Sequence, residues 1–461
     1  MEKQRSVAVI GAGPVGLAAA AQALERGWQP VVLEAGATVG AAIREWAHVR
    51  MFSPWRYNID KASERLLQET GWNAPDPEAY PTGGELYERY LEPLAKRTRL
   101  AGSIKTSATV TSISRVGFDK VKSAGRDKAP FEVRYRNGAG GGAIRVAAVI
   151  DTSGTWRSPN PAGGDGTCVP GEAENSARIR YGMPDVLGRD RTRYAGKRVA
   201  VLGAGHSALG TLIDLVQLKE TAPATEPVWI LRGDDPAKSF GGGAADQLAE
   251  RGALGLKLAE IVSSGRLEIV KSFSVARMDL HADRLRIAST AGRDVLVDEL
   301  VVATGFRPDL SFLREIRVSL DPALECPPAL APLIDPNEHS CGTVRPHGAR
   351  ELSQPEPGFY IAGMKSYGRA PTFLMATGYE QVRSIVADID GDKAAAAKVE
   401  LELPETGVCS APPALASLKG TLAAASTGCC GGPPKTTKDA CCVADEKAKA
   451  AGAKGCGCSG K

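Results

Sequence analysis

The sequence lacks the features that define several large classes of protein. It has no block of Lys or Arg residues and a net charge of only +4, so nothing in it indicates a nucleic-acid partner. Apart from Val7–Leu24, it has no apolar stretch long enough to span a bilayer. The 43% hydrophobic and 24% charged fractions are those of an ordinary globular protein, and 461 residues suggest two or three domains. We therefore expect a cytoplasmic protein that meets no membrane.

Cysteine is sparse over most of the chain. Of the 10 cysteines, only Cys168, Cys326 and Cys341 precede residue 400. This is not the pattern of a secreted domain held together by disulfides. No Cys-x-x-Cys motif occurs anywhere, so the usual redox-active dithiol is absent.

What the chain does have is a glycine turn near its beginning. The apolar run Val7–Ile10 leads into GAGPVG, an Ala-rich stretch follows, and a second apolar run ends on an acid. This order predicts a strand, a tight turn, a helix whose N-terminus faces a pyrophosphate, and a second strand whose acid binds a ribose. A membrane helix or signal peptide is the alternative, but three glycines and a proline crowd the first half of the run, and no positively charged flank with a cleavage site precedes it. The predicted cofactor-binding residues are Gly11, Gly13, Pro14, Gly16 and Glu34.

A second copy of this unit lies in the middle of the chain. KRVAVLGAGHSALGTLIDL repeats the strand, turn and helix, and the following strand ends on Arg232. The carboxylate of Glu34 suits a free 2′-hydroxyl, as on the adenosine of FAD, whereas Arg232 suits the 2′-phosphate of NADPH. Asp234 and Asp235 follow closely, so NADH stays an alternative. The predicted cofactor-binding residues here are Gly203, Gly205, His206, Ser207 and Arg232.

Two later strands also end in small residues, in ATGFRPD and in GFYIAG. They add Thr304, Gly305 and Gly363 to the predicted cofactor-binding residues. Ala370-Pro371-Thr372 is expected to begin a helix that runs to about Asp388, with Pro371 in its first turn.

Taken in order, these four motifs resemble the flavoproteins with two dinucleotide-binding domains, a superfamily that includes thioredoxin reductases and flavin-containing monooxygenases. The resemblance covers about residues 5–390. It implies an α/β fold of two Rossmann-like domains, in which an FAD domain is split around an inserted NAD(P)H domain. We expect the first part of the FAD domain at 1–160, the NAD(P)H domain with its entry linker at 161–298, the second part of the FAD domain at 299–392, and a disordered Cys-rich tail at 393–461.

The resemblance also implies where the chemistry takes place. The segment Arg44–Asp60, rich in Trp, Arg, His and Phe, would lie beside the flavin, with Arg44 among the cofactor-binding residues. Arg56 and Asn58 are the predicted catalytic residues, and a purely structural role for both is the alternative. The helix start at Pro371 and Thr372 would direct its dipole at the flavin. The implied cofactors are FAD and NADPH, and the implied partners are a small-molecule substrate and O₂.

RMFSPWRYNID, IRYGMPDVLG and GMKSYGRAPTFLMATGYEQV are more narrowly similar to flavin monooxygenase-like proteins found with bacterial arsenic-resistance genes. The chain departs from both broad groups. It has neither the reductase dithiol nor the Phe-x-Gly-x-x-x-His fingerprint of the monooxygenases, and Met364 stands where an acid usually holds the ribityl chain. An N- or S-oxygenating activity therefore does not transfer automatically.

The C-terminal cysteines occur in close groups. Neighbouring thiolates capture soft ions such as As(III), Zn²⁺ or Cu(I), and a flexible tail could instead carry a Cys pair to the flavin. EHSCGTVRPHG, with His339, Cys341 and His347, is a weaker candidate of the same kind. Three hypotheses follow: a monooxygenase-like enzyme linked to arsenic or metalloid resistance, a thiol-dependent disulfide or metalloid reductase, and a thiol-rich metalloid-binding or sensing protein. The oligomeric state stays open, a homodimer included. The predicted metal ligands are Cys429, Cys430, Cys441, Cys442, Cys456 and Cys458.

Overall fold

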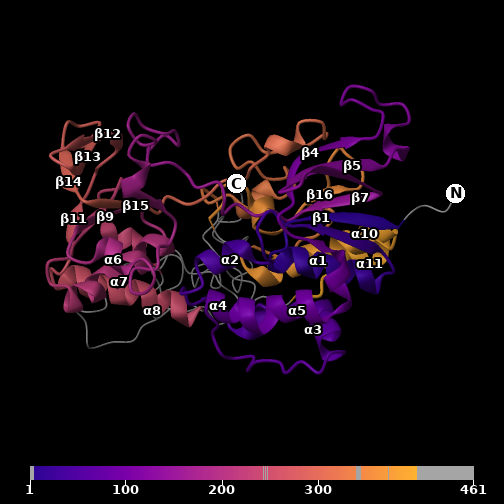
Figure 1. The fold of residues 1–461 in the computed structure, drawn as a ribbon, viewed down its shortest axis with the longest axis horizontal. Helices are drawn as coiled ribbons and strands as arrows, with labels where there is room; N and C mark the ends of the chain where they lie inside the picture. The colour runs from indigo at the N-terminus through magenta and orange to yellow at the C-terminus, as the bar shows by residue number, and fades with distance from the viewer. Residues whose placement is uncertain are drawn as a thin grey trace, which may run out of the picture. The chain divides into compact units, whose positions relative to one another are not determined.

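The computed structural model describes residues 5–241, 243, 246, 248–338, 344–371 and 373–401 (Figure 1). The chain separates into two units, Met1–Pro413 and Ala414–Lys461, and every described residue belongs to the first. Thr372, His339, Cys341 and the six predicted cysteine ligands of the tail lie outside the described residues. No helix in the described part is long and apolar enough to cross a membrane.

The first lobe is built on a five-stranded parallel sheet. Its strand order is β16-β7-β1-β2-β3, so the last of the described strands pairs with β7, next to the first strand. In Figure 1 β16 accordingly lies beside the purple β7, which separates it from the indigo β1. The strands are β1 (Ser6–Ile10), β2 (Gln29–Leu33), β3 (Ile104–Lys105), β7 (Ala148–Asp151) and β16 (Phe359–Ile361).

The second lobe repeats this architecture. Its parallel sheet has the order β11-β10-β9-β15-β8, in which β9 takes the place of β1. In each lobe a three-stranded antiparallel sheet precedes one strand of the parallel sheet, β7 in the first lobe and β15, which occupies the equivalent position, in the second. The strands of the parallel sheet are β8 (Ile179–Tyr181), β9 (Arg198–Leu202), β10 (Glu226–Ile230), β11 (Glu268–Val270) and β15 (Glu299–Val302). The antiparallel sheets are β4 (Thr109–Arg115), β5 (Phe131–Asn137) and β6 (Gly140–Val146) in the first lobe, and β12 (Val275–His281), β13 (Arg284–Ser289) and β14 (Asp294–Val297) in the second.

Helices cover the sheets and place small residues where they approach closely. Helix α1 (Pro14–Glu25) follows β1, and all of its residues from Pro14 to Ala23 are buried. A methyl group at Gly378 of α10 (Met375–Asp390) would lie 2.5 Å from Val15 Cγ2, so α10 packs tightly against α1. The other helices are α2 (Ala41–Glu45), α3 (Lys61–Gln68), α4 (Gly83–Leu86), α5 (Glu92–Arg97), α6 (Arg191–Tyr194), α7 (His206–Thr221), α8 (Ala249–Ser263), α9 (Ala331–Ile334) and α11 (Lys393–Ala397).

The predicted fold class is confirmed, because two Rossmann-like sheets are present and β16 returns to the first of them. Two predicted domain boundaries are wrong. β15 begins at Glu299 yet pairs with β9 and β8, so the second lobe extends to Val302 instead of ending at 298. The predicted tail 393–461 begins too early, because α11 is helical and Ser384 Oγ of α10 donates to the Ala396 carbonyl at 2.6 Å.

The helix expected from Ala370 also begins later than predicted. Leu374 is its N-cap, and the first intrahelical bonds run from the amides of Thr377 and Gly378 to the Leu374 carbonyl. Pro371 therefore precedes α10 instead of lying in its first turn.

Candidate dinucleotide-binding sites

The first glycine turn has the geometry that its spacing predicts. Gly11 has φ +95°, a conformation that strains any residue with a side chain. A methyl group at Gly16 would lie 2.0 Å from the Gly11 carbonyl oxygen and 2.8 Å from Thr152 Oγ1. These two glycines therefore let the turn, helix α1 and the end of β7 pack against one another.

Gly13 has a different part in the turn. It is the N-cap of α1, with Pro14 at the first helical position, and a methyl group placed on it would meet nothing within 4 Å. The space in front of the helix N-terminus is therefore open on this side, as a bound pyrophosphate requires. The backbone N–H groups of the first turn and the helix dipole both favour an anion there.

Glu34 lies at the carboxyl end of β2, next to this turn. One of its carboxylate oxygens accepts a hydrogen bond from the Ala12 amide at 2.7 Å, and the other accepts from the Gly36 amide at 2.7 Å. The carboxylate is thus fixed beside the turn, where the acid of a dinucleotide fold binds a ribose. Together with the open space at Gly13, this arrangement fits an adenine dinucleotide.

The second turn shows the same division of roles. Gly203 has φ +141°, and a methyl group on it would lie 2.3 Å from the Ala303 carbonyl oxygen. Gly205 caps α7 and has open space around it, like Gly13. Trp229 Nε1 donates to the Gly203 carbonyl at 2.7 Å, and this hydrogen bond helps to fix the turn. At the position equivalent to Gly16 stands Ala208, which is fully buried.

Arg232 follows β10, at the same edge of the second sheet. It is exposed, and its Nη1 donates to the Gly164 carbonyl at 2.8 Å. The neighbouring acids are engaged, since Asp234 pairs with Lys238 at 3.6 Å and Asp235 accepts from the Ala237 amide at 2.9 Å. The guanidinium of Arg232 thus lies at the edge of the sheet where an adenosine 2′-substituent would lie.

His206 is the first residue of α7, and Phe52 from the first lobe packs against it with ring centroids 5.2 Å apart. Desolvation by the surrounding protein and then the charge of Arg251 lower the pKa of His206, against the opposing effect of Asp246. The imidazole is therefore neutral near pH 7. The aromatic segment expected beside the flavin thus reaches the second glycine turn.

The two predicted catalytic residues both have structural partners. Arg56 is exposed, forms an ion pair with Glu78 and lies over the Tyr57 ring, 4.9 Å from its centroid. Asn58 is fully buried, and its amide donates to the carbonyls of Ser53 and Pro54 at 2.7 and 3.0 Å. Asn58 therefore shapes its own loop, which is the alternative that the sequence left open. The predicted catalytic roles stay predictions.

The remaining predicted residues lie at three places. Arg44 on α2 donates to Thr38 Oγ1 at 3.3 Å and lies over the Tyr87 ring. Thr304 and Gly305 are both hydrogen-bonded to Asn160. The main-chain N–H of Asn160 donates to the Gly305 carbonyl at 2.9 Å, and its side-chain Nδ2 donates to the Thr304 carbonyl at 3.1 Å. These bonds join the two segments that connect the lobes. Ser207 follows His206 in the first turn of α7.

Gly363 has φ +70° and packs against Val15, so the segment after β16 brings a fourth glycine to the first turn. Since β1, β7 and β16 are parallel, their following residues meet at one edge of the first sheet. Ligands of open α/β sheets bind at this carboxyl edge.

A buried ion pair lies at the same edge and was not expected. Lys365 and Asp151 are both fully buried, with Nζ 2.6 Å from Oδ2, and Nζ also reaches Ser153 Oγ at 3.1 Å. The pair links the end of β7 to the turn after β16. Nothing in the sequence reveals it, because Asp151 and Lys365 stand 214 residues apart.

The segments that connect the lobes carry a second unexpected cluster. Trp156 stacks on Phe306 with centroids 4.8 Å apart, and its Nε1 donates to Glu45 Oε2 at 2.8 Å. Arg157 pairs with the other oxygen of Glu45, also at 2.8 Å. Glu45 lies at the end of α2. Its carboxylate therefore fixes the connecting segment that contains Trp156 and Arg157 to the first lobe.

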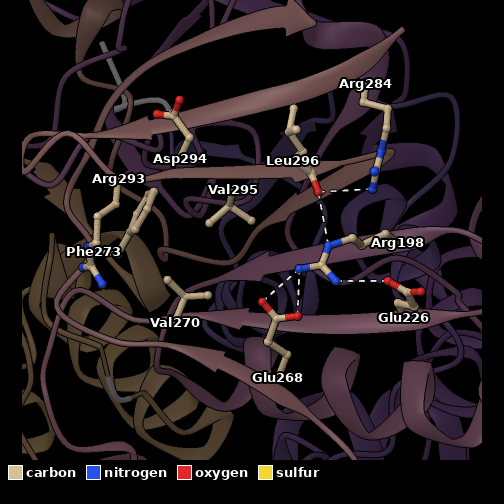
Figure 2. Close-up of a pocket in the computed structure, with 10 residues that line it drawn as sticks. All are labelled: Arg198, Glu226, Glu268, Val270, Phe273, Arg284, Arg293, Asp294, Val295 and Leu296. Atoms are coloured by element: carbon tan, nitrogen blue, oxygen red, sulfur yellow. Dashed lines mark hydrogen bonds and ion pairs between the residues drawn. The ribbon is translucent and has the colours of Figure 1, made fainter. Parts of the chain in front are cut away.

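A hollow of about 390 Å³ lies at the opposite, amino edge of the second sheet (Figure 2). Arg198 crosses it, with its guanidinium between Glu226 at 3.0 Å and Glu268 at 2.7 Å (Figure 2). Arg198 and Arg284 both donate to the Leu296 carbonyl. These ion pairs join the starts of β9, β10 and β11, and the hollow lies at the wrong edge to be a nucleotide site.

The described residues contain no group of His, Cys, Asp or Glu side chains that could hold a metal ion. His347, a weak candidate ligand, is buried and both of its ring nitrogens have protein partners. Of the described cysteines, Cys168 is exposed, whereas burial raises the pKa of the Cys326 thiol to about 12.

Comparison with known proteins defines the class. Residues 8–328 match the family model described as pyridine nucleotide-disulphide oxidoreductase, and the chain belongs to this family. The predicted superfamily and the predicted cofactors, FAD and NAD(P)H, are confirmed. No curated protein sequence matches the chain.

Solved structures share the fold at low identity. The bacillithiol disulfide reductase Bdr (YpdA) from Bacillus cereus is similar with a TM-score of 0.61 and 18% identity, over 84% of this chain and 99% of that one. DfoA from Erwinia amylovora, a cadaverine monooxygenase bound to FAD, gives 0.60 and 14% over 88% and 98%. The ornithine N-hydroxylase KtzI from Kutzneria gives 0.55 and 18% over 85% and 99%. Reductases and monooxygenases are thus both among the similar structures.

Proposed function

We propose that this chain is an FAD-dependent NADPH oxidoreductase of the monooxygenase type that acts on a small molecule, with an arsenical as the preferred candidate. The observation that carries the proposal is the pair of open glycine turns with opposite charges beside them, Glu34 at one and Arg232 at the other. FAD would occupy the first turn and NADPH the second. Bound FAD supplies the redox chemistry, because it accepts a hydride and passes electrons to a second acceptor.

The protein's own residues bind and orient the two nucleotides. Gly13 and the first turn of α1 offer backbone N–H groups to one pyrophosphate, and Gly205 and the first turn of α7 offer them to the other. Glu34 would accept a hydrogen bond from a ribose of FAD. Arg232, whose side chain donates to the neutral Gly164 carbonyl, would pair with the 2′-phosphate, which supports NADPH over NADH.

Oxygen, or a small molecule, is the favoured electron acceptor because the sequence contains no Cys-x-x-Cys. Among the described cysteines, Cys168 and Cys326 stand far apart in sequence, and the latter is a buried thiol. An arsenical is the candidate substrate because of the narrow sequence resemblance and the paired cysteines of the tail. Catalytic roles for Arg56 and Asn58 are part of this proposal: Arg56 would contact the reacting atoms, and Asn58, whose amide is bound within its own loop, would act by positioning that loop.

The test uses the purified full chain. We expect bound FAD, NADPH oxidation coupled to O₂ uptake, and stimulation of both by the right arsenical. A protein that holds no FAD and cannot be reloaded with it would refute the proposal. Reduction by NADPH without oxygen, followed by admission of O₂, distinguishes an oxygenase, which is reoxidised quickly, from a reductase, which waits for another acceptor.

The close cysteine groups of the tail favour a second candidate, a disulfide or metalloid reductase that uses those thiols. In that case NADPH turnover should persist without O₂ and collapse in a chain that ends at residue 401. Turnover unchanged by the deletion would exclude this candidate. Tight As(III) binding with no NADPH turnover would point instead to a metalloid-binding or sensing protein.

A further inference from the structure

A buried hydrogen-bond chain connects a histidine to the glycine turn after β16. Gln381 on α10 accepts from the Gly363 amide at 2.7 Å through Oε1. Its Nε2 lies 2.8 Å from His347 Nε2 and 3.0 Å from Ser366 Oγ. Gln381 and Ser366 are 0% exposed and His347 is 3% exposed, so water does not share these bonds.

The partners determine where the protons lie. Ser366 Oγ donates to the Gly363 carbonyl at 2.7 Å, so its oxygen is free to accept from Gln381. The amide of Gln381 then donates one proton to Ser366 and the other to His347 Nε2, while Oε1 accepts from Gly363. His347 Nδ1 lies 3.0 Å from the Arg345 carbonyl and must donate to it. His347 is therefore a neutral imidazole with its proton on Nδ1.

This geometry makes the turn at Gly363 sensitive to the protonation of His347. A second proton on Nε2 would face the amide protons of Gln381, and two donors cannot share a hydrogen bond. Gln381 would have to rotate away, and the Gly363 amide would lose the acceptor that Gln381 provides. We propose that His347 is a positioning residue that holds the FAD-binding turn through Gln381 and releases it when the imidazole is protonated. This inference rests on the proposed function, because it takes Gly363 as part of the FAD site.

The groups around His347 set the direction of the pH effect. Burial lowers the pKa of His347, and Arg345 lowers it further, whereas the Arg345 carbonyl, Glu351 and Glu380 oppose them. Tyr367 packs with its ring centroid 5.7 Å away and stays neutral, because burial raises its pKa. FAD bound against the turn favours the neutral imidazole, so by linkage protons weaken FAD binding. Because burial holds the pKa of His347 below the ordinary histidine value of about 6.5, FAD binding should be strongest at and above that pH and weaken once the pH falls below the lowered pKa.

The test measures the dissociation constant of FAD for the full-length protein from the fluorescence of released flavin, between about pH 8 and about pH 5. For wild type we expect affinity to fall by up to about tenfold per pH unit below the pKa of the FAD-free form. His347→Gln keeps an acceptor for Gln381 but cannot titrate, so its affinity should match wild type near pH 8 and stay flat in acid. The same acid loss in this variant would overturn the inference.

A second variant tests the same link from the other side. In Gln381→Glu, one carboxylate oxygen accepts from Gly363 and the other can accept from protonated His347, so acid should no longer weaken FAD binding. Acid loss as in wild type would contradict the proposal. His281→Gln, at an exposed histidine of β12, is the matched control and should keep the wild-type profile. Wild type that binds no FAD near pH 8 would refute the proposed function as well, whereas pH-independent binding refutes this inference alone.

Discussion

Two of the three glycines in the first turn, Gly13 and Gly16, should respond differently when each receives a single methyl group. In Gly16→Ala the new Cβ would lie 2.0 Å from the Gly11 carbonyl oxygen, and this oxygen belongs to the backbone and cannot swing away. Helix α1 must shift, and overpacking of this kind costs about 1–3 kcal/mol of folding free energy. In Gly13→Ala the Cβ meets nothing within 4 Å, so the apo protein should keep its stability.

Their effects on FAD binding should not follow their effects on stability. The Gly13→Ala methyl group would occupy the space proposed for the pyrophosphate, so FAD affinity should fall by at least about tenfold, or about 1.4 kcal/mol. The assays are thermal unfolding of the FAD-free protein and titration with FAD. Ala208→Gly in the second turn is the matched control, because it should leave FAD binding unchanged. Equal stability of Gly16→Ala and wild type, or unchanged FAD affinity of Gly13→Ala, would refute the reasoning.

Three further outcomes are expected. Arg232→Ala should raise KM for NADPH by roughly 10–100-fold and barely change KM for NADH, since a charge-assisted hydrogen bond contributes about 1.5–3 kcal/mol; equal effects on both would exclude a 2′-phosphate contact. Lys365→Met leaves the Asp151 carboxylate buried without its cation and should cost about 3–5 kcal/mol, measured by thermal unfolding, and a second change of Asp151→Asn should restore part of it. Burial raises the pKa of Asp214 from its ordinary value of 3.8 to about 6, so its cost to stability grows as the pH rises between these two values and is complete above about 6. Asp214→Asn should therefore stabilise the protein near pH 7.5 and have almost no effect near pH 3.5, and the opposite order would contradict this sign.

Local backbone requirements are what could be predicted from the sequence. Gly11 and Gly203 have positive φ and lie in close contact with the residues that follow β7 and β15. Only glycine meets both requirements easily, so a short run of residue types is enough to predict such a turn. The positions of Glu34 and Arg232 could also be predicted, because each residue follows a strand that the pattern of apolar residues indicates. The order of residue types along the chain therefore predicts both dinucleotide sites and the fold class.

Roles that depend on distant partners could not be predicted. Asn58 is a local exception: its amide is bound by the carbonyls of Ser53 and Pro54, five and four residues away, and this structural role was one of the two alternatives that the sequence offered. The partner of Lys365 and the acceptor of the Gly363 amide come from elements brought together only by the sheet and α10. The start of α10 was misplaced because Pro371 is compatible both with a first helical turn and with the turn that precedes one.

The position of β16 has a consequence for the way the chain folds during synthesis. The second lobe is continuous in sequence and can close as soon as β15 leaves the ribosome. The first lobe cannot, because its sheet lacks an edge strand until Phe359–Ile361 and its helix α1 lacks its neighbour until α10. Arg5 finally pairs with Asp390 at 2.6 Å, across 385 residues. Of the two lobes, the one whose synthesis begins earlier is thus completed later, and a nascent chain truncated before α10 would expose the apolar face of α1 to chaperones and proteases.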